Sequence, residues 1–342
     1  MNNNLLKIYC GILKSEAPYL EILNPNFGFK KRKNIFGDKD IFDDFTSPIF
    51  NIVSEPSISD FLLIPHNYFQ IKNDKQYISN FISLSEKYSK KIIIFAIGDS
   101  TEHIDIPNSL ILRMSQYESR RKINEIIIPA YAADLSYGKP ILYRTKQSMP
   151  SIGFCGWADI KGFLPNLSFL IKNFISLNGS HRKGLYFRKK TINNIKKSLI
   201  IKPNLIVRSA YGASESTTEM NPKIAREEYR NNMIESDFIL APKGDGNYSA
   251  RFYEALSLGR VPILIDTDCP LPLSKEIDYS KFILKISYKD IGKLDKIVAD
   301  FYKKLSNEEW INMQKAAKNA FDQYLRIDVF FRNLFKNENL IY

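Results

Sequence analysis

Arg251 and Glu254 lie three residues apart just after a glycine-rich turn, and side chains at this spacing share one face of a helix. A guanidinium can neutralise a phosphate, and a carboxylate can accept hydrogen bonds from the two neighbouring hydroxyl groups of a ribose. Lys243, in the turn itself, would add a second positive charge. These groups predict a site for a charged nucleotide. The alternative is an exposed ion pair that binds nothing and contributes about 0.2–0.5 kcal/mol.

The segment around these residues predicts a strand, a turn, a helix and a second strand. Residues 238–241 and 261–265 are apolar runs of strand length, whereas residues 243–246 have the composition of a turn. Asn247 or Ser249 can cap the helix that follows the turn. The free N–H groups at the start of that helix would then point at one place beside the turn, which suits a diphosphate.

Three glycines shape this unit. Gly244 and Gly246 would let the backbone of the turn come close to a ligand, and Gly259 can end the helix. A glycine pair alone is weak evidence, because turns need glycine for conformational reasons. Its place between a strand and a helix favours the binding interpretation.

The same residues resemble the nucleotide-sugar half of exostosin-like glycosyltransferases. The segment at 59–65 is similar to a further strand of that family, and the segment at 126–131 is similar to another of its segments, Val-Ile-Pro-Pro-Tyr. The chain differs from the family in having Lys243 where arginine is usual and His66 where an aromatic residue is common. The shared pattern comprises Pro-Lys-Gly at 242–244, Ser-x-Arg at 249–251, Glu-Ala-Leu at 254–256, Val-Pro-Ile-Leu-Ile at 261–265, Leu-Pro-Leu at 271–273 and Ile-Asp-Tyr-Ser-Lys-Phe at 277–282.

The resemblance implies a GT-B fold and an inverting sugar transfer from a nucleotide-sugar, with side chains and a helix dipole in place of a metal ion. Lys243, Arg251 and Glu254 would hold the donor. The basic stretch at 181–188 is similar to one that the family places early in its second domain, so Arg182 or Arg188 would reach the diphosphate. No cofactor besides the donor substrate is expected.

An inverting transfer needs a general base that removes the proton of the acceptor hydroxyl. In an α/β sheet such a group is expected where a strand ends at the cleft. Asp99 follows the apolar run 92–97, and His66 follows the run 61–64, so both residues are candidates. Asp99 could instead cap a helix or a turn, and His66 could be a hydrogen-bonded loop histidine.

The sequence Asp-Thr-Asp at 266–268 has the spacing of a manganese site in other glycosyltransferases. We expect no metal there, since the motif follows a strand at a point where the similar family has a plain loop. The acidic pairs at 38–40 and 43–44 are expected to be solvated loop carboxylates. The three cysteines are far apart, which indicates neither a zinc site nor a disulfide framework and suits a reducing compartment.

The chain has 342 residues and a formal net charge of +12, which calls for an acidic partner or reflects solvated helix faces. Basic clusters stand at 30–33 and 120–122 without the interleaved aromatic residues or the modules typical of nucleic-acid binding. We therefore expect no nucleic acid. These clusters would contact anionic lipid headgroups, at the periphery of a membrane, or a lipid-diphosphate-linked acceptor.

Short apolar segments alternate with helical patterns along the chain, which predicts an α/β protein with two doubly wound parallel sheets facing a cleft. A restart of this rhythm after proline at 150 divides it into an acceptor-side domain, 1–147, and a nucleotide-sugar domain, 148–305. Residues 306–342 would return to the first domain. Ser306 and Glu309 form a capping box, and Trp310, Met313, Ala317, Phe321 and Tyr324 predict one apolar helix stripe.

The sequence therefore predicts a cytoplasmic glycosyltransferase that moves a sugar from a UDP-sugar to a surface glycan. The longest apolar run is of strand length, and the N-terminus lacks the pattern of a signal peptide. The abundance of asparagine, isoleucine and lysine is typical of an AT-rich genome, bacterial or viral, which points to capsule or lipopolysaccharide. The alternatives are a non-enzymatic module that binds nucleic acid or a phosphorylated polymer, and a GT-B fucosyltransferase that uses GDP-fucose.

Overall fold

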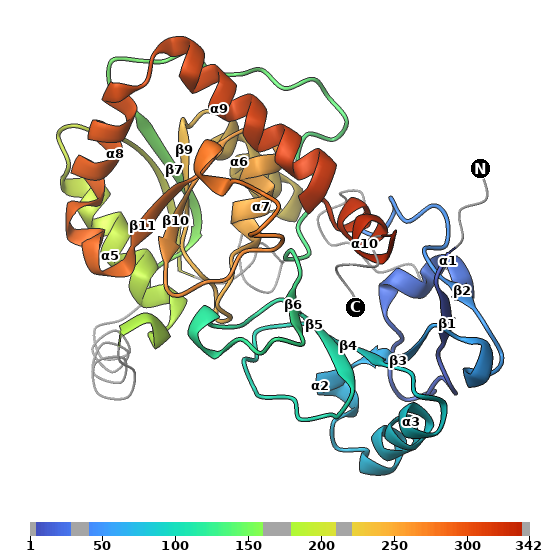
Figure 1. The fold of residues 1–342 in the computed structure, drawn as a ribbon. Helices are drawn as coiled ribbons and strands as arrows, with labels where there is room; N and C mark the ends of the chain where they lie inside the picture. The colour runs from blue at the N-terminus through green and yellow to red at the C-terminus, as the bar shows by residue number, and fades with distance from the viewer. Residues whose placement is uncertain (1–4, 29–40, 160–178, 210–220, 337–342) are drawn as a thin grey trace.

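The computed structural model describes residues 5–28, 41–159, 179–209 and 221–336, and it contains two parallel sheets (Figure 1). The sheet of the first half has the strand order β2-β1-β3-β4-β5-β6, with parallel pairing throughout. Its strands are β1 (Lys7–Tyr9), β2 (Asn51–Ile52), β3 (Phe61–Asn67), β4 (Ile92–Ala96), β5 (Ser109–Arg113) and β6 (Glu125–Ile127).

The sheet of the second half has the order β11-β10-β9-β7-β8 and is also parallel. Its strands are β7 (Ser151–Trp157), β8 (Lys202–Arg208), β9 (Phe238–Ala241), β10 (Val261–Asp266) and β11 (Leu284–Ser287).

Helices connect the strands, as parallel pairing requires. Asp74 caps α3 by accepting a hydrogen bond from the Tyr77 amide, and Asn221 caps α6 in the same way through the Lys223 amide. The helices are α1 (Asn24–Phe27), α2 (Tyr68–Ile71), α3 (Lys75–Tyr88), α5 (Gly184–Lys197), α6 (Pro222–Ile234), α7 (Ala250–Ser257), α8 (Leu294–Lys304), α9 (Asn307–Ala320) and α10 (Ile327–Lys336). Short 3-10 turns are η1 (Glu21–Leu23), η2 (Pro56–Ile58), η3 (Glu118–Arg120), η4 (Gly179–His181), η5 (Tyr279–Lys281) and η6 (Tyr288–Lys293).

The central strands are continuous apolar runs because both faces of each sheet are covered. Every residue of β4 and β9 is buried, and the two runs read Ile-Ile-Ile-Phe-Ala and Phe-Ile-Leu-Ala. Two parallel α/β sheets with a C-terminal return are the architecture that the sequence predicted, so the expected α/β, GT-B-like fold class is confirmed.

The C-terminal helices carry the chain from the second half back to the first. The predicted capping box is present: Ser306 Oγ accepts from the Glu309 amide, and Glu309 accepts from the Ser306 amide. The predicted apolar stripe is buried up to Phe321, but Tyr324 is 42% exposed. Its expected burial was wrong, because residues Phe321–Leu325 form a π-helix and the wider turn moves Tyr324 off the stripe.

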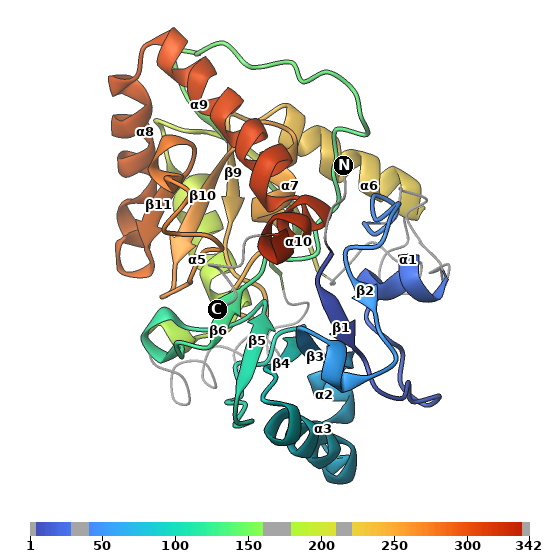
Figure 2. The ribbon, with the colours of Figure 1, turned by 45° about the vertical axis from the view of Figure 1, so that its right-hand side comes forward.

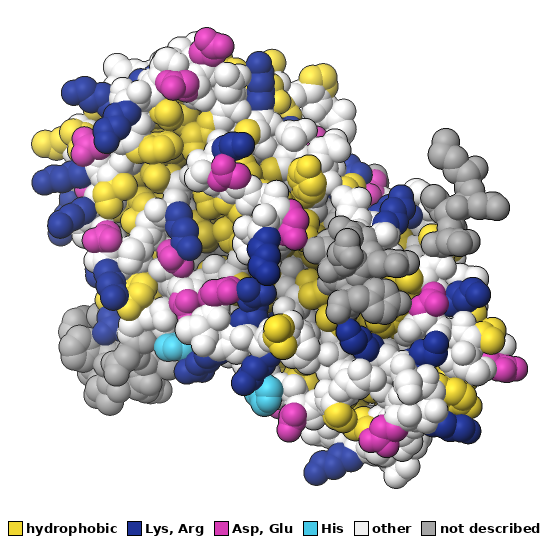
Figure 3. All heavy atoms as spheres, viewed as in Figure 1, with side chains coloured by type: hydrophobic (Ala, Val, Ile, Leu, Met, Phe, Trp, Pro, Cys, Tyr) yellow, Lys and Arg dark blue, Asp and Glu magenta, His cyan; other side chains and the backbone are white. Residues whose placement is uncertain are grey.

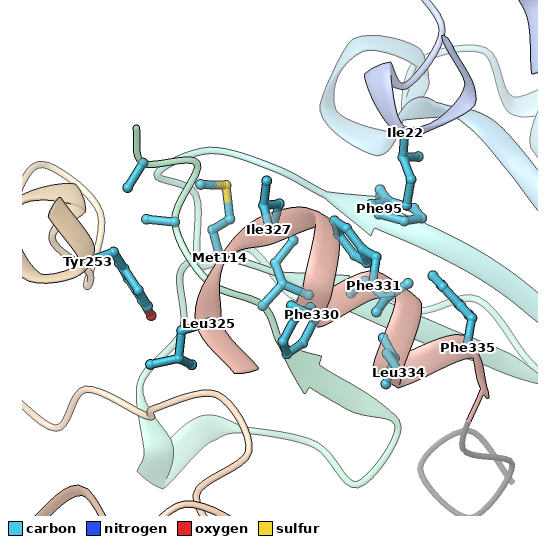
Figure 4. Packing of buried hydrophobic residues seen from close by; sticks show 14 of the residues in the cluster. Ile22, Phe95, Met114, Tyr253, Leu325, Ile327, Phe330, Phe331, Leu334 and Phe335 are labelled. Carbon is cyan, nitrogen blue, oxygen red and sulfur yellow. The ribbon is translucent and has the colours of Figure 1, made fainter. Parts of the chain in front are cut away.

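Helix α10 completes the core of the first half. In both ribbon views it lies between the two sheets (Figures 1 and 2). Figure 4 shows Phe331 facing Phe95 of β4, with ring centroids 5.6 Å apart, while Tyr253 of α7 lies on the side of the second half. Phe335 packs against Phe50, with ring centroids 4.6 Å apart. One apolar cluster therefore runs through both halves.

The chain joins the second half before the boundary that the sequence predicted at 147. Leu135 is fully buried against residues of α6, β9 and α7, and Arg144 donates to the Asp237 carboxylate at 2.7 Å. Gln314 of α9 accepts from the Arg144 amide at 2.9 Å. Leu135 and Arg144 thus pack against the second half.

Some sequence predictions fall on residues outside the described ranges: a helix at 169–177, the basic cluster at 30–33 and the acidic pair at 38–40. Lys and Arg side chains on the face shown in Figure 3 are spread among acidic and apolar side chains without forming a single patch. In the described part of the chain, none of the helices combines the length and the apolar character needed to cross a membrane.

Candidate functional site

A cavity of about 560 Å³ lies between the two halves, a volume within the range of small-ligand sites. The first half contributes Asp99, Met114 and Tyr131 to its wall. The second half contributes most of the remaining wall, from the ends of β7 and β8, from α6 and from the turn and helix that follow β9. Of the site residues predicted from sequence, Asp99, Arg188, Gly244, Ser249, Arg251 and Glu254 line this cavity.

Arg251 projects into the cavity from the first turn of α7. Its Nη2 donates to the Cys155 carbonyl at 3.0 Å, and its guanidinium lies 4.5 Å from the Phe154 ring centroid. Gly156 makes room for it, because a Cβ atom at that position would lie 2.8 Å from Nη2. The Nε–H of Arg251 is buried and has no hydrogen-bond partner within the described residues. A buried donor beside a cavity is suited to an anionic ligand.

Ser249 stands at the N-cap of α7 and also lines the cavity, but its side chain makes no capping hydrogen bond within the described structure. The predicted cap is therefore absent there. The helix start faces the cavity beside Arg251, so its positive end and the guanidinium act on the same space.

Glu254 is 8% exposed and is held by helix α6. Tyr229 donates its hydroxyl hydrogen to one carboxylate oxygen, and Arg226 donates to the other at 3.2 Å. Burial raises the pKa of Tyr229 well above its ordinary value, and the Glu254 charge acts in the same direction. Glu254 is thus held in a fixed position at the cavity wall by two hydrogen bonds.

The turn between β9 and α7 is closed by a hydrogen bond from the Gly244 amide to the Tyr248 carbonyl at 2.9 Å. Gly246 does not line the cavity but faces Asp99. A Cβ atom at position 246 would lie 2.7 Å from Oδ1 of Asp99, so glycine is needed where the two halves meet.

Lys243, which the sequence predicts to contact a phosphate, is not among the residues that line the cavity. Its Nζ donates to the Tyr117 hydroxyl at 3.0 Å and to the Ser180 carbonyl at 2.8 Å, and the residue is 4% exposed. Burial lowers its pKa to about 8. The side chain is a hydrogen-bonded link between the halves, since Tyr117 belongs to the first.

The two arginines predicted near the diphosphate are separated by the structure. Arg188, on α5, lines the cavity and donates to the Trp157 carbonyl at 3.2 Å. Arg182 does not line it, and its guanidinium lies over the Tyr186 ring at 4.5 Å. Within the pair, only Arg188 is placed to reach a ligand in this cavity.

The two candidate bases are also separated. Asp99 follows β4, is exposed and faces the cavity. His66 lies elsewhere and is fully buried: the Lys14 amide donates to Nε2 at 3.0 Å, and Nδ1 lies 3.0 Å from the Pro18 carbonyl oxygen. Burial lowers the pKa of His66. Both ring nitrogens are engaged in hydrogen bonds, and of the two predicted bases Asp99 lines the cavity whereas His66 does not.

Sequence reasoning missed several residues of the junction between the halves. Asn247, considered only as a helix cap, is 2% exposed and bonds to both halves. Its amide donates to Ser115 Oγ at 2.9 Å, and its Oδ1 accepts from Thr267 at 2.7 Å. Arg208 and Trp157, at the ends of β8 and β7, line the cavity as well. A polar residue after a predicted strand is the signal that could have flagged them.

The carboxylates of the Asp-Thr-Asp motif have partners on the protein. Asp266 pairs with Lys285 at 3.0 Å, and Asp268 accepts from the Ser119 hydroxyl at 2.5 Å. Among the residues that the structure describes, no group of three or more histidine, cysteine or acidic side chains is placed to hold a metal ion.

Comparison with known proteins agrees with the resemblance seen in the sequence. Residues 175–301 match the family model described as the exostosin GT47 domain. The chain is 29% identical over 106 residues to an exostosin-1 homolog of Caenorhabditis elegans, a match that covers 31% of this chain and 27% of that protein. It is 24% identical over 206 residues to the probable glucuronoxylan glucuronosyltransferase IRX7 of Arabidopsis thaliana, covering 59% of this chain and 39% of that protein.

The chain is therefore a distant homologue of exostosin and of plant GT47 glycosyltransferases, and it spans well under half the length of these relatives. Among solved structures, a glycosyltransferase from Rickettsia africae is similar with a TM-score of 0.37 and 12% identity, over 84% of each chain.

Proposed function

We propose that this chain is a glycosyltransferase that moves a sugar from a nucleotide-sugar to a glycan acceptor in the cavity between its two halves. The observation that carries the proposal is Arg251, whose buried Nε–H has no partner within the described residues and lies beside the start of α7. The homology of residues 175–301 to the exostosin GT47 domain supports the same class of reaction.

The donor diphosphate would lie against Arg251, Arg188 and the first amides of α7. A diphosphate carries its charge on several oxygens, and two guanidinium groups with a helix start can distribute hydrogen bonds among them. These groups also stabilise the charge that develops on the diphosphate as the glycosidic bond breaks, which lowers the barrier.

Glu254 would accept hydrogen bonds from the ribose hydroxyls. Tyr229 and Arg226 already hold its carboxylate in place, so little conformational freedom is lost on binding. A carboxylate has room for further donors after two hydrogen bonds, because its two oxygens offer about four acceptor positions. We propose UDP as the nucleotide because the chain resembles the exostosin-like glycosyltransferases.

Asp99 would act as the base of an inverting transfer. It would take the proton of the acceptor hydroxyl while that oxygen attacks the anomeric carbon from the face opposite the diphosphate. The bond from the anomeric carbon to the diphosphate oxygen breaks, and the diphosphate leaves with the electron pair. Asp99 suits this role because it approaches the cavity from the half opposite Arg251.

The acceptor that we propose is a surface glycan such as capsule or lipopolysaccharide, free or lipid-linked. Arg120, Arg121 and Lys122 are exposed at the junction of the two halves and would contact anionic headgroups at a membrane.

The test is binding of UDP, GDP and CMP by calorimetry, with the wild-type chain and two variants. Arg251→Ala should lower the affinity for the preferred nucleotide at least tenfold, or by about 1.4 kcal/mol of binding free energy, because a diphosphate contact is lost. Arg182→Ala removes a similar charge outside the cavity and should change the affinity less than about twofold. Absence of nucleotide binding, together with salt-sensitive binding of a polyanion, would refute the proposal in favour of a polymer-binding module. Preference for GDP would favour a fucosyltransferase.

A further inference from the structure

A buried arginine connects the two sides of the candidate active site. Arg113 ends β5, is 0% exposed and pairs with Glu125 of β6, which is 2% exposed, at 2.5 Å. Gln116 and the Lys122 amide also donate to the Glu125 carboxylate. The charge of Arg113 is thus balanced by a carboxylate that is itself well bonded, which is the condition under which a buried ion pair is tolerated.

The remaining donors of Arg113 reach the loop that carries the proposed base. Nη2 donates to the carbonyls of Ser100 and Glu102, each at 3.1 Å. Ser100 directly follows Asp99 in the chain. One guanidinium nitrogen therefore fixes the backbone on the C-terminal side of Asp99 by two hydrogen bonds.

The Nε of Arg113 reaches the donor side of the cavity through one further residue. It donates to the Ser115 carbonyl at 3.0 Å, and Ser115 Oγ accepts from the amide of Asn247 at 2.9 Å. The carbonyl of Gln116 accepts from the Asn247 side chain at 2.9 Å. Asn247 belongs to the turn between β9 and α7 that precedes Arg251.

We propose that Arg113 is a positioning residue that sets the separation between the base Asp99 and the donor-binding turn. The inference rests on the proposed function. The planar guanidinium is required, since its donors must reach Ser100, Glu102, Ser115 and Glu125 at once, whereas lysine has one nitrogen on a flexible stem. An error of about 1 Å in such a separation can slow a reaction by about a hundredfold.

The chain offers a matched control in a second buried arginine. Arg260 is 3% exposed and also donates to backbone carbonyls, those of Ile234, Leu258 and Leu142. It does not line the cavity. Replacing either arginine by lysine should cost stability in a similar way, but only the change at Arg113 should affect turnover.

The experiment compares Arg113→Lys and Arg260→Lys with the wild-type chain, using the nucleotide-sugar whose nucleotide binds best. We expect Arg113→Lys to lower kcat at least tenfold while the dissociation constant for the nucleotide changes less than about threefold. Amide hydrogen exchange should increase in the segment 98–102. Arg260→Lys should lower the melting temperature yet keep kcat within about twofold of the wild type.

Ser115→Ala provides a milder variant if Arg113→Lys does not fold, because it removes only the hydrogen bond to the Asn247 amide. It should lower kcat severalfold, with a smaller loss of melting temperature than in Arg113→Lys, because one hydrogen bond is lost and not a whole network. A wild-type kcat in Arg113→Lys, or an equal loss in Arg260→Lys, overturns the positioning role alone. A wild-type chain that binds none of the nucleotides overturns the proposed function, and this inference with it.

Discussion

Asp99 and Gly246 meet where the two halves of the molecule come together, one at the end of a strand of the first sheet and the other in the turn that precedes α7. A Cβ atom at position 246 would lie 2.7 Å from the Asp99 carboxylate and 2.9 Å from its Cα. The missing side chain of a glycine therefore sets how closely the proposed base approaches the turn that precedes α7.

Gly246→Ala should separate these two segments. Because the added carbon would collide with the Asp99 backbone, either Asp99 or the turn must move, and we expect transfer activity to fall at least tenfold. Gly292→Ala is the control, since a Cβ atom there meets no atom within 4 Å. Kinetics on both variants test the prediction, and full activity in Gly246→Ala would show that the close approach has no role in turnover.

Tyr229→Phe should weaken nucleotide binding without affecting diphosphate binding. The substitution removes the hydroxyl that holds Glu254, which we assign to the ribose, but leaves Arg251 and the start of α7 unchanged. We expect the affinity for UDP to fall about three- to tenfold, in keeping with the loss of a hydrogen bond to a charged group. Calorimetry with UDP and with inorganic diphosphate separates the contribution of the ribose contact from that of the diphosphate contact. An equal loss of affinity for UDP and for inorganic diphosphate would contradict the assignment of Glu254 to the ribose.

Lys243 should make the stability of the chain depend on pH in the weakly alkaline range. Its pKa is about 8 in the folded chain and about 10.4 in an unfolded one, so between these values the unfolded state binds more protons. The free energy of unfolding must then rise with pH, by about 1 kcal/mol from pH 7 to pH 9, whereas below pH 7 this lysine contributes no pH dependence. Urea unfolding at both pH values should show that Lys243→Met removes this increase, while the exposed Lys197→Met retains it.

Phe331→Ala should destabilise the whole molecule. Phe331 is fully buried and packs against Phe95 of β4 and Phe45, so its loss leaves a cavity within the core of the first half. The expected cost is about 3–5 kcal/mol in the free energy of unfolding. Tyr324→Ala, at an exposed position in the same region, should cost less than about 1 kcal/mol. Denaturant titration of both variants measures these two free energies of unfolding. If Phe331→Ala lowered the free energy of unfolding only slightly, α10 would not be essential to the core.

Much of the fold could be predicted from the sequence because its central strands are continuous apolar runs. Residues 92–97 and 238–241 are short apolar runs followed by turn residues, and they match β4 and β9 to within one residue. The short strand β6 was not predicted as a strand, since three residues carry no periodicity of their own. The exposure of Tyr324 could not be foreseen either, because the π-helix interrupts a regular helical pattern.

Only part of the site could be predicted, because local spacing identifies residues on one helix but not which side chains face the cavity. Arg251 and Glu254 follow each other on one helix, so local spacing was enough to place them on one wall. Whether a side chain faces the cavity depends on tertiary packing, which separated Asp99 from His66 and left Lys243 behind the turn. Arg113 is linked through contacts with distant segments, which no local pattern can reveal.

The position of α10 has a consequence for how the chain is made. The core of the first half needs Phe331 and Phe335, which are synthesised about 240 residues after β4. During synthesis on a ribosome, the apolar face of the first sheet stays uncovered until α10 has been made. The second sheet can already pack against its own helices by then. The usual order of folding along a nascent chain, N-terminal unit first, is therefore expected to be reversed in this molecule.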